Sequence, residues 1–165
     1  MPSMFQTAKL VGNVVKEVIA QSSPDGERAD SYFNASFILG GQIRGTEPRL
    51  FMIYPEGNFI ESSEDTPFFQ VGETKYGKPI IVRAYDRTMS FAETVKLLLV
   101  SFDSTLKSNL SVGLPLDLLF YGKDSFKVGL KKRIAQDDPY YRTISHGWSN
   151  ALKQAFRSLP DFPET

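Results

Sequence analysis

The chain has 165 residues, 41% of them hydrophobic and 13% aromatic, which is the composition of a globular protein with a sizeable core. Lys plus Arg and Asp plus Glu both number 19, so the net charge is zero and no nucleic-acid partner is indicated. With no cysteine and a single histidine, the sequence excludes disulfides, thiol nucleophiles and metal sites built from cysteines or several histidines, and we expect neither a metal nor a cofactor.

Nothing in the sequence indicates a membrane protein. No run approaches the roughly 20 apolar residues that a membrane-spanning helix needs. No signal peptide is recognisable ahead of the first predicted helix, so we expect a cytoplasmic protein without a membrane partner. The two Asn-x-Ser matches, at Asn34 and Asn109, are then not expected to carry glycans.

The first predicted element is an amphipathic helix over residues 3–20. Ser3 followed by Gln6 is a capping-box pattern, and the apolar residues that follow recur at helical spacing. A polar turn at residues 22–26 ends the helix. The predicted buried face consists of Met4, Ala8, Val11, Val15 and Val18.

An antiparallel meander is predicted next. Residues 32–43 alternate between two faces at a period of two, which predicts a strand, and the β-rich runs 49–54 and 59–61 follow after short turns. A further short strand is expected at residues 68–71. Because the first two strands are apolar on both faces, we expect other layers of the domain to cover both sides of the sheet.

Residues 72–79 fit most of a P-loop pattern. Two glycines, Gly72 and Gly77, stand at the required spacing before a lysine. The eighth position should provide a hydroxyl for magnesium, but Pro79 stands there, and Glu73 places a negative charge where phosphate would bind. We therefore interpret the segment as a turn flanked by glycines, not as a nucleotide site.

A long helix is predicted from Ser90, which forms a second capping box with Glu93, to Leu106. Further apolar residues beside its main stripe indicate a helix between layers or at a subunit interface. The predicted stripe consists of Phe91, Val95, Leu98, Phe102 and Leu106.

A β-hairpin and a helix complete the predicted elements. Runs 114–121 and 126–130 flank a Gly-Lys-Asp-Ser turn, and the basic run 131–133 is expected to end the second strand as a solvated edge. Asp138 has the position of an N-cap for the last helix, which Pro160 stops. The predicted stripe of this helix is Tyr141, Ile144, Trp148, Leu152 and Ala155.

Long blocks of the sequence resemble, in order, the bacterial proteasome-related family called Anbu. The similarity covers nearly the whole chain. Its blocks are residues 33–43, 54–61, 66–70, 72–80, 101–105, 108–115 and 137–140.

This resemblance implies an α+β fold of the N-terminal-nucleophile hydrolase class, an αββα sandwich in which two antiparallel sheets pack between helical layers. It also implies a homo-oligomer and a peptide substrate. In such peptidases the first residue of the mature chain, a threonine, attacks with its hydroxyl while its own amine is the general base. A lysine and an aspartate on the following strands tune that amine.

The sequence departs from the family where catalysis begins. The similarity starts at about the family's second helix, so we expect a single proteasome-like domain over residues 1–165 that is N-terminally truncated and lacks the catalytic strands. Residue 2 is a proline, and Thr7 lies within the first predicted helix, where its nitrogen cannot be a free amine. No catalytic residue is expected in this chain.

Supporting residues of the site can still be carried over from the resemblance. Glu73, Thr74 and Lys75 fall in the loop beside the nucleophile, and Ser108 and Ser111 fall where proteasome subunits place an Asp and a Ser that orient the threonine amine. We expect Glu73, Ser108 and Ser111 to cluster. The alternative is that both serines are turn residues at a helix end.

Two further polar residues are assigned structural roles. Asp103 is expected to be a solvated or capping charge on its helix. His146 is expected to be a surface or packing residue, since no serine or carboxylate is placed to complete a triad with it.

Three functional hypotheses follow. The first is the C-terminal portion of a proteasome-type threonine peptidase, inactive as this chain. The second is a non-catalytic structural or assembly subunit of a proteasome-like oligomer. The third, in which the amine of Pro2 acts as a base, is weaker, because Pro2 is well explained as the residue before a helix cap. In each case, strand edges left without their family partners should favour self-association.

Overall fold

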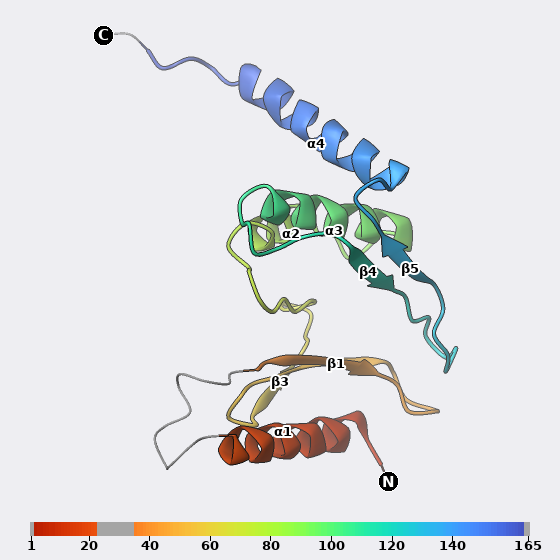
Figure 1. Cartoon of the computed structure of the whole chain (residues 1–165). Helices are drawn as coiled ribbons and strands as arrows, with labels where there is room; N and C mark the ends of the chain where they lie inside the picture. Colours follow the sequence, from red (N-terminus) through yellow and green to blue (C-terminus); the bar gives the residue numbers. More distant parts are fainter. Residues whose placement is uncertain (1, 23–34, 164–165) are drawn as a thin grey trace. The chain divides into compact units, whose positions relative to one another are not determined.

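The computed structural model describes residues 2–22 and 35–163 and divides the chain into two compact units (Figure 1). The first unit consists of residues up to Gly72 together with Phe120–Gly129, and the second consists of Glu73–Leu119 and the residues from Leu130 onward. The single-domain organisation stays a prediction, and residues 32–34 of the first predicted strand lie outside the described residues.

The first unit opens with helix α1, Met4–Gln21, and the predicted capping box is confirmed. The Ser3 hydroxyl accepts from the Gln6 backbone N–H at 3.2 Å, and the Gln6 side chain accepts from the Ser3 N–H at 3.0 Å. The buried face differs at its end from the predicted stripe, because Gly12 is buried while Val18 is exposed. A Cβ at Gly12 would collide with the carbonyl oxygen of Gly57, so α1 packs against the sheet at a position that only glycine allows.

Helix α1 covers one face of a three-stranded antiparallel sheet (Figure 1). The strands are β1, Phe37–Gly41, β2, Arg49–Ile53, and β3, Phe59–Glu61, in the order β1-β2-β3, which confirms the predicted meander. Phe51, fully buried on β2, forms the core of this unit with Met4 and Ala8.

The fourth strand predicted at residues 68–71 is wrong. These residues are irregular, and no strand of the described residues pairs with them. Their aromatic and β-branched composition favours an extended backbone. An extended segment forms a strand only where a neighbouring strand can hydrogen-bond to it.

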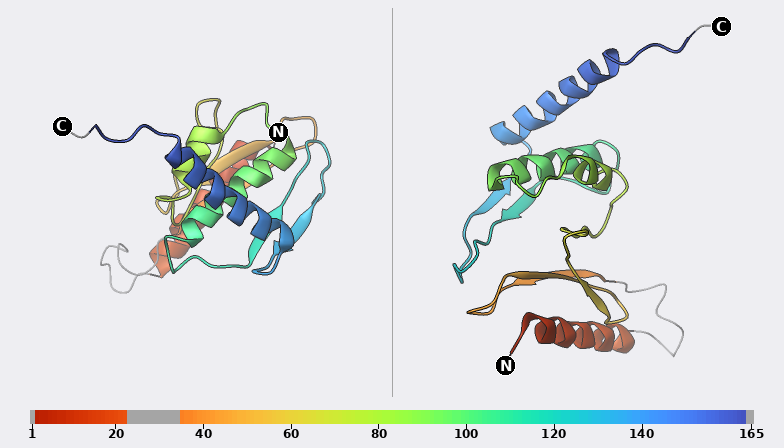
Figure 2. Two further views of the ribbon diagram at one scale, coloured as in Figure 1. Left: turned by 90° about the horizontal axis from the view of Figure 1, so that it is seen from above. Right: turned by 180° about the vertical axis from the view of Figure 1, so that it is seen from behind.

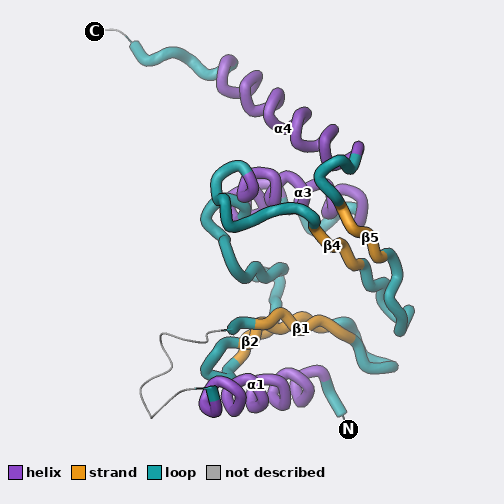
Figure 3. The backbone as a smooth tube through the Cα atoms, viewed as in Figure 1, coloured by secondary structure: helices purple, strands orange, loops and turns teal. Residues whose placement is uncertain are grey.

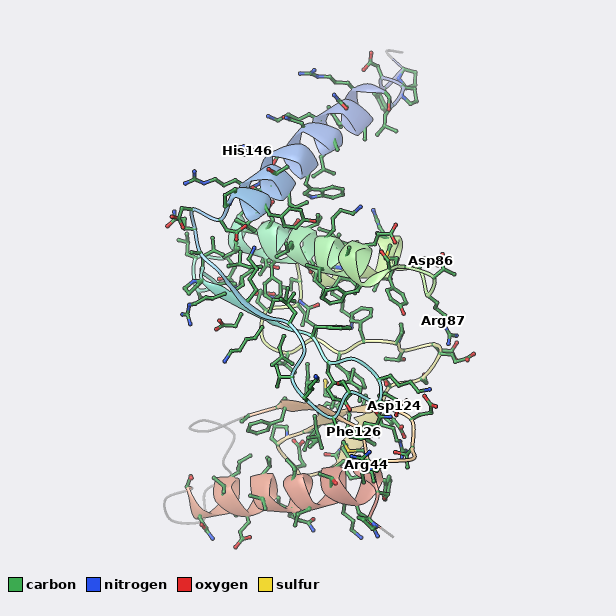
Figure 4. The ribbon with its side chains drawn as sticks, turned by 90° about the vertical axis from the view of Figure 1, so that its right-hand side faces the viewer. Arg44, Asp86, Arg87, Asp124, Phe126 and His146 are labelled. Carbon is green, nitrogen blue, oxygen red and sulfur yellow. The ribbon has the colours of Figure 1, made fainter. Side chains whose placement is uncertain are left out.

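The turn after β1 is held by a set of hydrogen bonds to the Gln42 side chain. The Gln42 amide donates to the Thr46 carbonyl and to the Asp124 carboxylate, both at 2.7 Å, and accepts from the Tyr121 hydroxyl at 2.9 Å and from the Asp124 N–H at 2.8 Å. The Arg44 guanidinium lies over the Phe126 ring, 4.6 Å from its centroid (Figure 4). All four hydrogen bonds that a primary amide can make in this plane are therefore satisfied within one unit.

The second unit contains three helices and a hairpin. The helices are α2, Lys78–Ala84, α3, Phe91–Leu106, and α4, Pro139–Arg157, and the strands are β4, Leu116–Leu119, and β5, Lys131–Ile134. Helix α4 crosses over α3, which lies between α4 and the hairpin (Figure 2). Helix α2 was not among the predicted elements. The core is formed by Leu99, Ile134 and Tyr141 with partly buried neighbours.

Helix α3 has the predicted capping box but buries a different face. Ser90 and Glu93 bond reciprocally, as expected. Leu97, Leu99 and Val100 are buried, whereas Leu98 and Phe102 of the predicted stripe are exposed. Because the helix is apolar on several sides, its periodicity alone does not decide which side faces the core.

The predicted hairpin exists, but its second strand begins at Lys131 instead of residue 126, after the long connection seen in Figure 3. Asp124 and Phe126 have positive φ, so the segment predicted as strand is a loop. The basic run, expected at a strand end, forms most of β5. Arg133 pairs with Asp117 across the hairpin, and the Lys132 ammonium lies 2.9 Å from the Asp138 carboxylate.

Asp138 caps α4 as predicted. Its carboxylate accepts from the Tyr141 N–H at 2.9 Å. The Lys132 ammonium and this backbone N–H together hold the pKa of Asp138 below its ordinary value. The N-terminal part of the predicted α4 stripe packs on α3, with Tyr141 buried, while Leu152 and Ala155 are exposed.

Candidate functional site

The loop that leads into α2 is shaped by the two glycines of the P-loop-like pattern. Gly72 has φ +80°, a conformation that favours glycine. A Cβ at Gly77 would lie 3.0 Å from the Ser101 carbonyl oxygen and closer still to the Ser101 hydroxyl. Each glycine thus has a conformational role, one in the turn and one in the close approach of the loop to α3.

The carboxylate of Glu73 is fixed in this loop by hydrogen bonds from two segments of the second unit. One oxygen accepts from the Lys75 backbone N–H at 2.8 Å, and the other accepts from the Asn109 amide at 2.9 Å. The Asn109 side-chain oxygen in turn accepts from the N–H of Ser111 at 2.8 Å and from its hydroxyl at 2.6 Å. We call these residues the Glu73 network.

The Glu73 network is anionic at neutral pH. The Lys75 N–H is the main reason why the pKa of Glu73 lies below its ordinary value, followed by the Asn109 amide and the charge of Lys75, which together outweigh partial burial. The Ser111 hydroxyl uses its hydrogen on Asn109 and keeps its lone pairs as acceptors. Both ends of the network therefore present acceptors, the chemistry that suits an ammonium or amine ligand.

The structure joins two of the predicted site residues and gives the others different contacts. Glu73 and Ser111 are joined through Asn109, while Thr74 offers its carbonyl to the Lys78 N–H in the first turn of α2. Ser108 donates its backbone N–H to the Thr105 carbonyl at 3.0 Å, at the end of α3. Its position there agrees with the alternative of a turn residue at a helix end.

Asn109, the central residue of the network, was not among the predicted site residues. Its signal in the sequence was the Asn-x-Ser match at residues 109–111, considered only as a glycosylation pattern. The same three residues form an Asx turn, in which an asparagine side chain accepts from the N–H two residues on.

Ser108 and Lys75 also line an apolar groove of about 480 Å³ in the second unit. Its walls come from α2 and the loop before it, the end of α3 and the middle of α4. The lining residues are Lys75, Tyr76, Pro79, Ile80, Arg83, Ala84, Ser104, Ser108, Trp148 and Leu152.

A second polar cluster joins α3 to α4. Asp103, expected to be solvated, is 1% exposed, and its carboxylate accepts from the Tyr141 hydroxyl at 3.1 Å and from the Lys107 ammonium at 2.8 Å. The ammonium also donates to the hydroxyls of Ser145 at 3.1 Å and Ser149 at 2.9 Å. The prediction for Asp103 is wrong because burial depends on α4, which covers this side of α3. We call this cluster the Asp103 network.

Neither polar cluster is arranged as a metal site. Among residues 2–22 and 35–163, no group of three or more His, Cys, Asp or Glu side chains could hold a metal ion. His146 lies exposed on α4 (Figure 4), in agreement with its prediction as a surface residue. No helix in the described part of the chain is long and apolar enough to cross a membrane.

Solved structures of Anbu proteins match the chain along nearly its full length. Anbu from Hyphomicrobium sp. strain MC1 matches with a TM-score of 0.89 and 51% identity, covering 99% of this chain and 66% of that one. Anbu, described as an ancestral beta-subunit, from Yersinia bercovieri matches with a TM-score of 0.89 and 46% identity over 99% and 68% of the two chains. The structure described as the helical assembly of the Anbu complex from Pseudomonas aeruginosa matches with a TM-score of 0.91 and 43% identity over 99% and 67%.

No family model matches the chain, and no curated protein does. The identities to the Anbu structures far exceed the level at which a likeness shows only a fold. The chain spans about two thirds of the length of the Anbu chains that it matches. It therefore belongs to the Anbu family and has that family's proteasome-like α+β fold of the N-terminal-nucleophile class.

Proposed function

We propose that residues 1–165 are the C-terminal portion of a proteasome-type threonine peptidase and do not hydrolyse amides on their own. The observation that supports this most is the Glu73 network, which lies in the loop and helix end where the family resemblance expects support for the nucleophile. The substrates of the complete site would be peptides or other amides.

In this proposal the network orients an amine and does not carry out the chemistry. A threonine nucleophile needs its α-amino group free, neutral and directed at its own hydroxyl. The Glu73 carboxylate and the Ser111 lone pairs can accept hydrogens from such an amine, and Asn109 keeps the two acceptors at a fixed separation. Glu73, Asn109 and Ser111 are thus positioning residues.

The nucleophile itself is not among these residues. Each threonine of the sequence is joined through its nitrogen to a preceding residue, so none has a free amine. Thr7, the first of them, donates its backbone N–H to the Ser3 carbonyl at 3.0 Å inside α1. Without an amine as general base, the remaining hydroxyls are ordinary alcohols and weak nucleophiles.

A hydrolysis assay tests the inactivity. The purified chain, incubated with a panel of fluorogenic peptide amides, should release no fluorophore above the rate of a heat-denatured sample. The matched control is the same chain with its N-terminal amine acetylated. Turnover that survives re-purification and is abolished by acetylation would refute the proposal and favour the Pro2 amine as a base.

The coding sequence upstream of residue 1 tests whether these residues are the C-terminal portion of a peptidase. An in-frame segment that opens with Met-Thr, ahead of residue 1, would supply the nucleophile and support the peptidase assignment. A stop codon immediately upstream, together with an intact mass equal to that of the 165 residues, would refute it.

The second candidate is a non-catalytic structural subunit of a homo-oligomer, and one observation favours it. Large apolar side chains are exposed on helices of both units, among them Leu10 on α1, Val82 on α2 and Phe156 on α4. Such side chains favour burial between copies. The Pseudomonas aeruginosa relative, described as a helical assembly, supports the same reading. A chain that stays monomeric at micromolar concentration in sedimentation would contradict it.

A further inference from the structure

The groove of the second unit combines apolar walls with a rim that carries only positive charge. Its walls include Tyr76, Ile80, Trp148 and Leu152, and no Asp or Glu is among the lining residues. A volume of about 480 Å³ lies within the range of ~300–1,000 Å³ typical of ligand pockets. This combination suits an apolar ligand with an attached negative charge.

Arg83 is the main charge of the rim. It lies in the last turn of α2, and no ion pair to it is present among the described residues. Lys75 also lines the groove, but it lies close enough to Glu73 to lower the pKa of that carboxyl, so part of its charge is already balanced. An anionic occupant would therefore pair first with Arg83.

Trp148 lines the groove from α4. Its indole N–H is buried and has no hydrogen-bond partner in the described part of the chain. Trp148 therefore contributes its aromatic ring to the groove wall, and the charge of the groove comes from Arg83 and Lys75.

The segment that follows α4 has the complementary chemistry. Leu159 is 64% exposed and Phe162 is 88% exposed, with Asp161 between them. Pro160 and Pro163 prevent the helix from continuing and restrict the backbone, which lowers the entropy lost when such a segment binds. The tail is an acidic and aromatic peptide whose large side chains are exposed.

We propose that the groove binds the C-terminal tail of a second copy of this chain, with Phe162 between the apolar walls and Asp161 paired with Arg83. A phenylalanine side chain buries about 150–250 Å² when it is enclosed in this way. The charges are complementary, since the groove lining is purely cationic and the tail residues 158–163 carry only Asp161 as a charge.

A second copy is the occupant because of the direction of the tail. Helix α4 stays helical from the groove residue Leu152 to Arg157, and the tail then leads away from α3 and the hairpin (Figure 1). The tail of the same chain would have to reverse at the helix end to return to its own groove. Two copies can instead exchange tails symmetrically, so that both grooves are filled and the assembly is closed.

The proposal extends the oligomer proposed above and does not depend on peptidase activity. It is tested by sedimentation of single charge variants, Arg83→Glu and Asp161→Lys, each of which should dimerise at least tenfold more weakly than the wild type. In a mixed dimer, Glu at position 83 of the first variant pairs with Lys at position 161 of the second variant. The other contact is the wild-type pair, Arg83 of the second variant with Asp161 of the first. Dimers should therefore reappear in the mixture at near wild-type affinity.

This mixing experiment separates the alternatives. If the tail binds its own groove, each variant carries its own repulsive pair and mixing restores nothing, a result that would overturn the proposal. Dimerisation that is unchanged in both single variants would also overturn the proposal. It would show that the copies associate through a different surface.

Two further measurements check the contact itself. Phe162→Ala should weaken dimerisation at least tenfold and should change the fluorescence of Trp148, the only tryptophan in the chain. The matched control is Leu119→Ala, a truncation of an exposed apolar residue at the end of β4 that does not line the groove. Equal effects of the two substitutions would refute the role of Phe162.

Discussion

The Asp103 network makes a quantitative prediction for the substitution Tyr141→Phe. The phenol oxygen donates to a carboxylate that is 1% exposed, while the ring is part of the core of the second unit. Phenylalanine keeps the ring and removes only the donor. A buried carboxylate oxygen then loses a hydrogen bond that neither water nor another residue replaces.

The expected cost follows from the charge of the acceptor. Hydrogen bonds to charged groups contribute about 1.5–3 kcal/mol, compared with about 1 kcal/mol for neutral pairs. We therefore expect the free energy of unfolding to fall by roughly 1.5–3 kcal/mol. If the second unit unfolds by itself, each kcal/mol lowers its melting temperature by about 4–8 °C.

Urea unfolding followed by the fluorescence of Trp148 is the suitable assay. This single tryptophan lies on α4 and therefore reports on the second unit, which matters because two compact units need not unfold together. The control is Tyr140→Phe, one residue earlier on the same helix and 45% exposed, which should change stability by less than about 0.5 kcal/mol.

The same contact predicts a pH dependence. Burial, together with the charge and the hydrogen bond of Asp103, raises the pKa of Tyr141 to about 12. In the unfolded chain a tyrosine titrates near ~10, so the folded state keeps the proton where the unfolded state has lost it. This contribution is fully present below about pH 10 and is lost as the pH rises toward about 12, by roughly 3 kcal/mol at most.

Tyr141→Phe should remove this part of the pH profile, and Tyr140→Phe should not. If the two variants have equal stability at neutral pH and equal profiles above about pH 10, then the Asp103 contact contributes nothing measurable and the reasoning is wrong.

Two predictions concern the loop beside α2. Gly77→Ala should destabilise the second unit by about 1–3 kcal/mol, because its Cβ would meet both the carbonyl and the hydroxyl of Ser101. The control is Gly113→Ala, which has no atom within 4 Å of the added carbon and should be neutral or stabilising by up to ~1 kcal/mol. Equal melting temperatures of the two variants would contradict this prediction. Asn109→Ala should raise the pKa of Glu73 by removing a donor to its charged form, and Asn109→Asp should raise it further by placing a like charge beside it. Carboxyl titration by NMR measures both, and an unchanged midpoint in the two variants would speak against the Glu73 network.

Sequence reasoning succeeded where structure is set by neighbours in the chain. The capping boxes at Ser3 and Ser90 and the N-cap at Asp138 were predicted because each bond spans three residues and depends on little else. The β1-β2-β3 meander was predicted for the same reason, since short turns leave adjacent strands little choice of partner.

The sequence indicated the two outer residues of the Glu73 network but not its central residue. Glu73 and Ser111 were named through the family resemblance, but Asn109, which bonds to both, was not. An asparagine in a turn usually bonds to its own backbone, and only the fold decides that its amide also reaches a carboxylate 36 residues away.

The sequence alone determined the family, the helix starts and the order of most elements. The family follows from long ordered blocks of similarity, and the helix starts and element order follow from local patterns. The tertiary structure decided which face of α3 is buried, where β5 begins and that Asp103 is enclosed. Each of these depends on contacts between elements far apart in the chain, such as Asp103 with Tyr141, 38 residues later. Burial is a property of the surface that two elements share, so neither segment specifies it by itself.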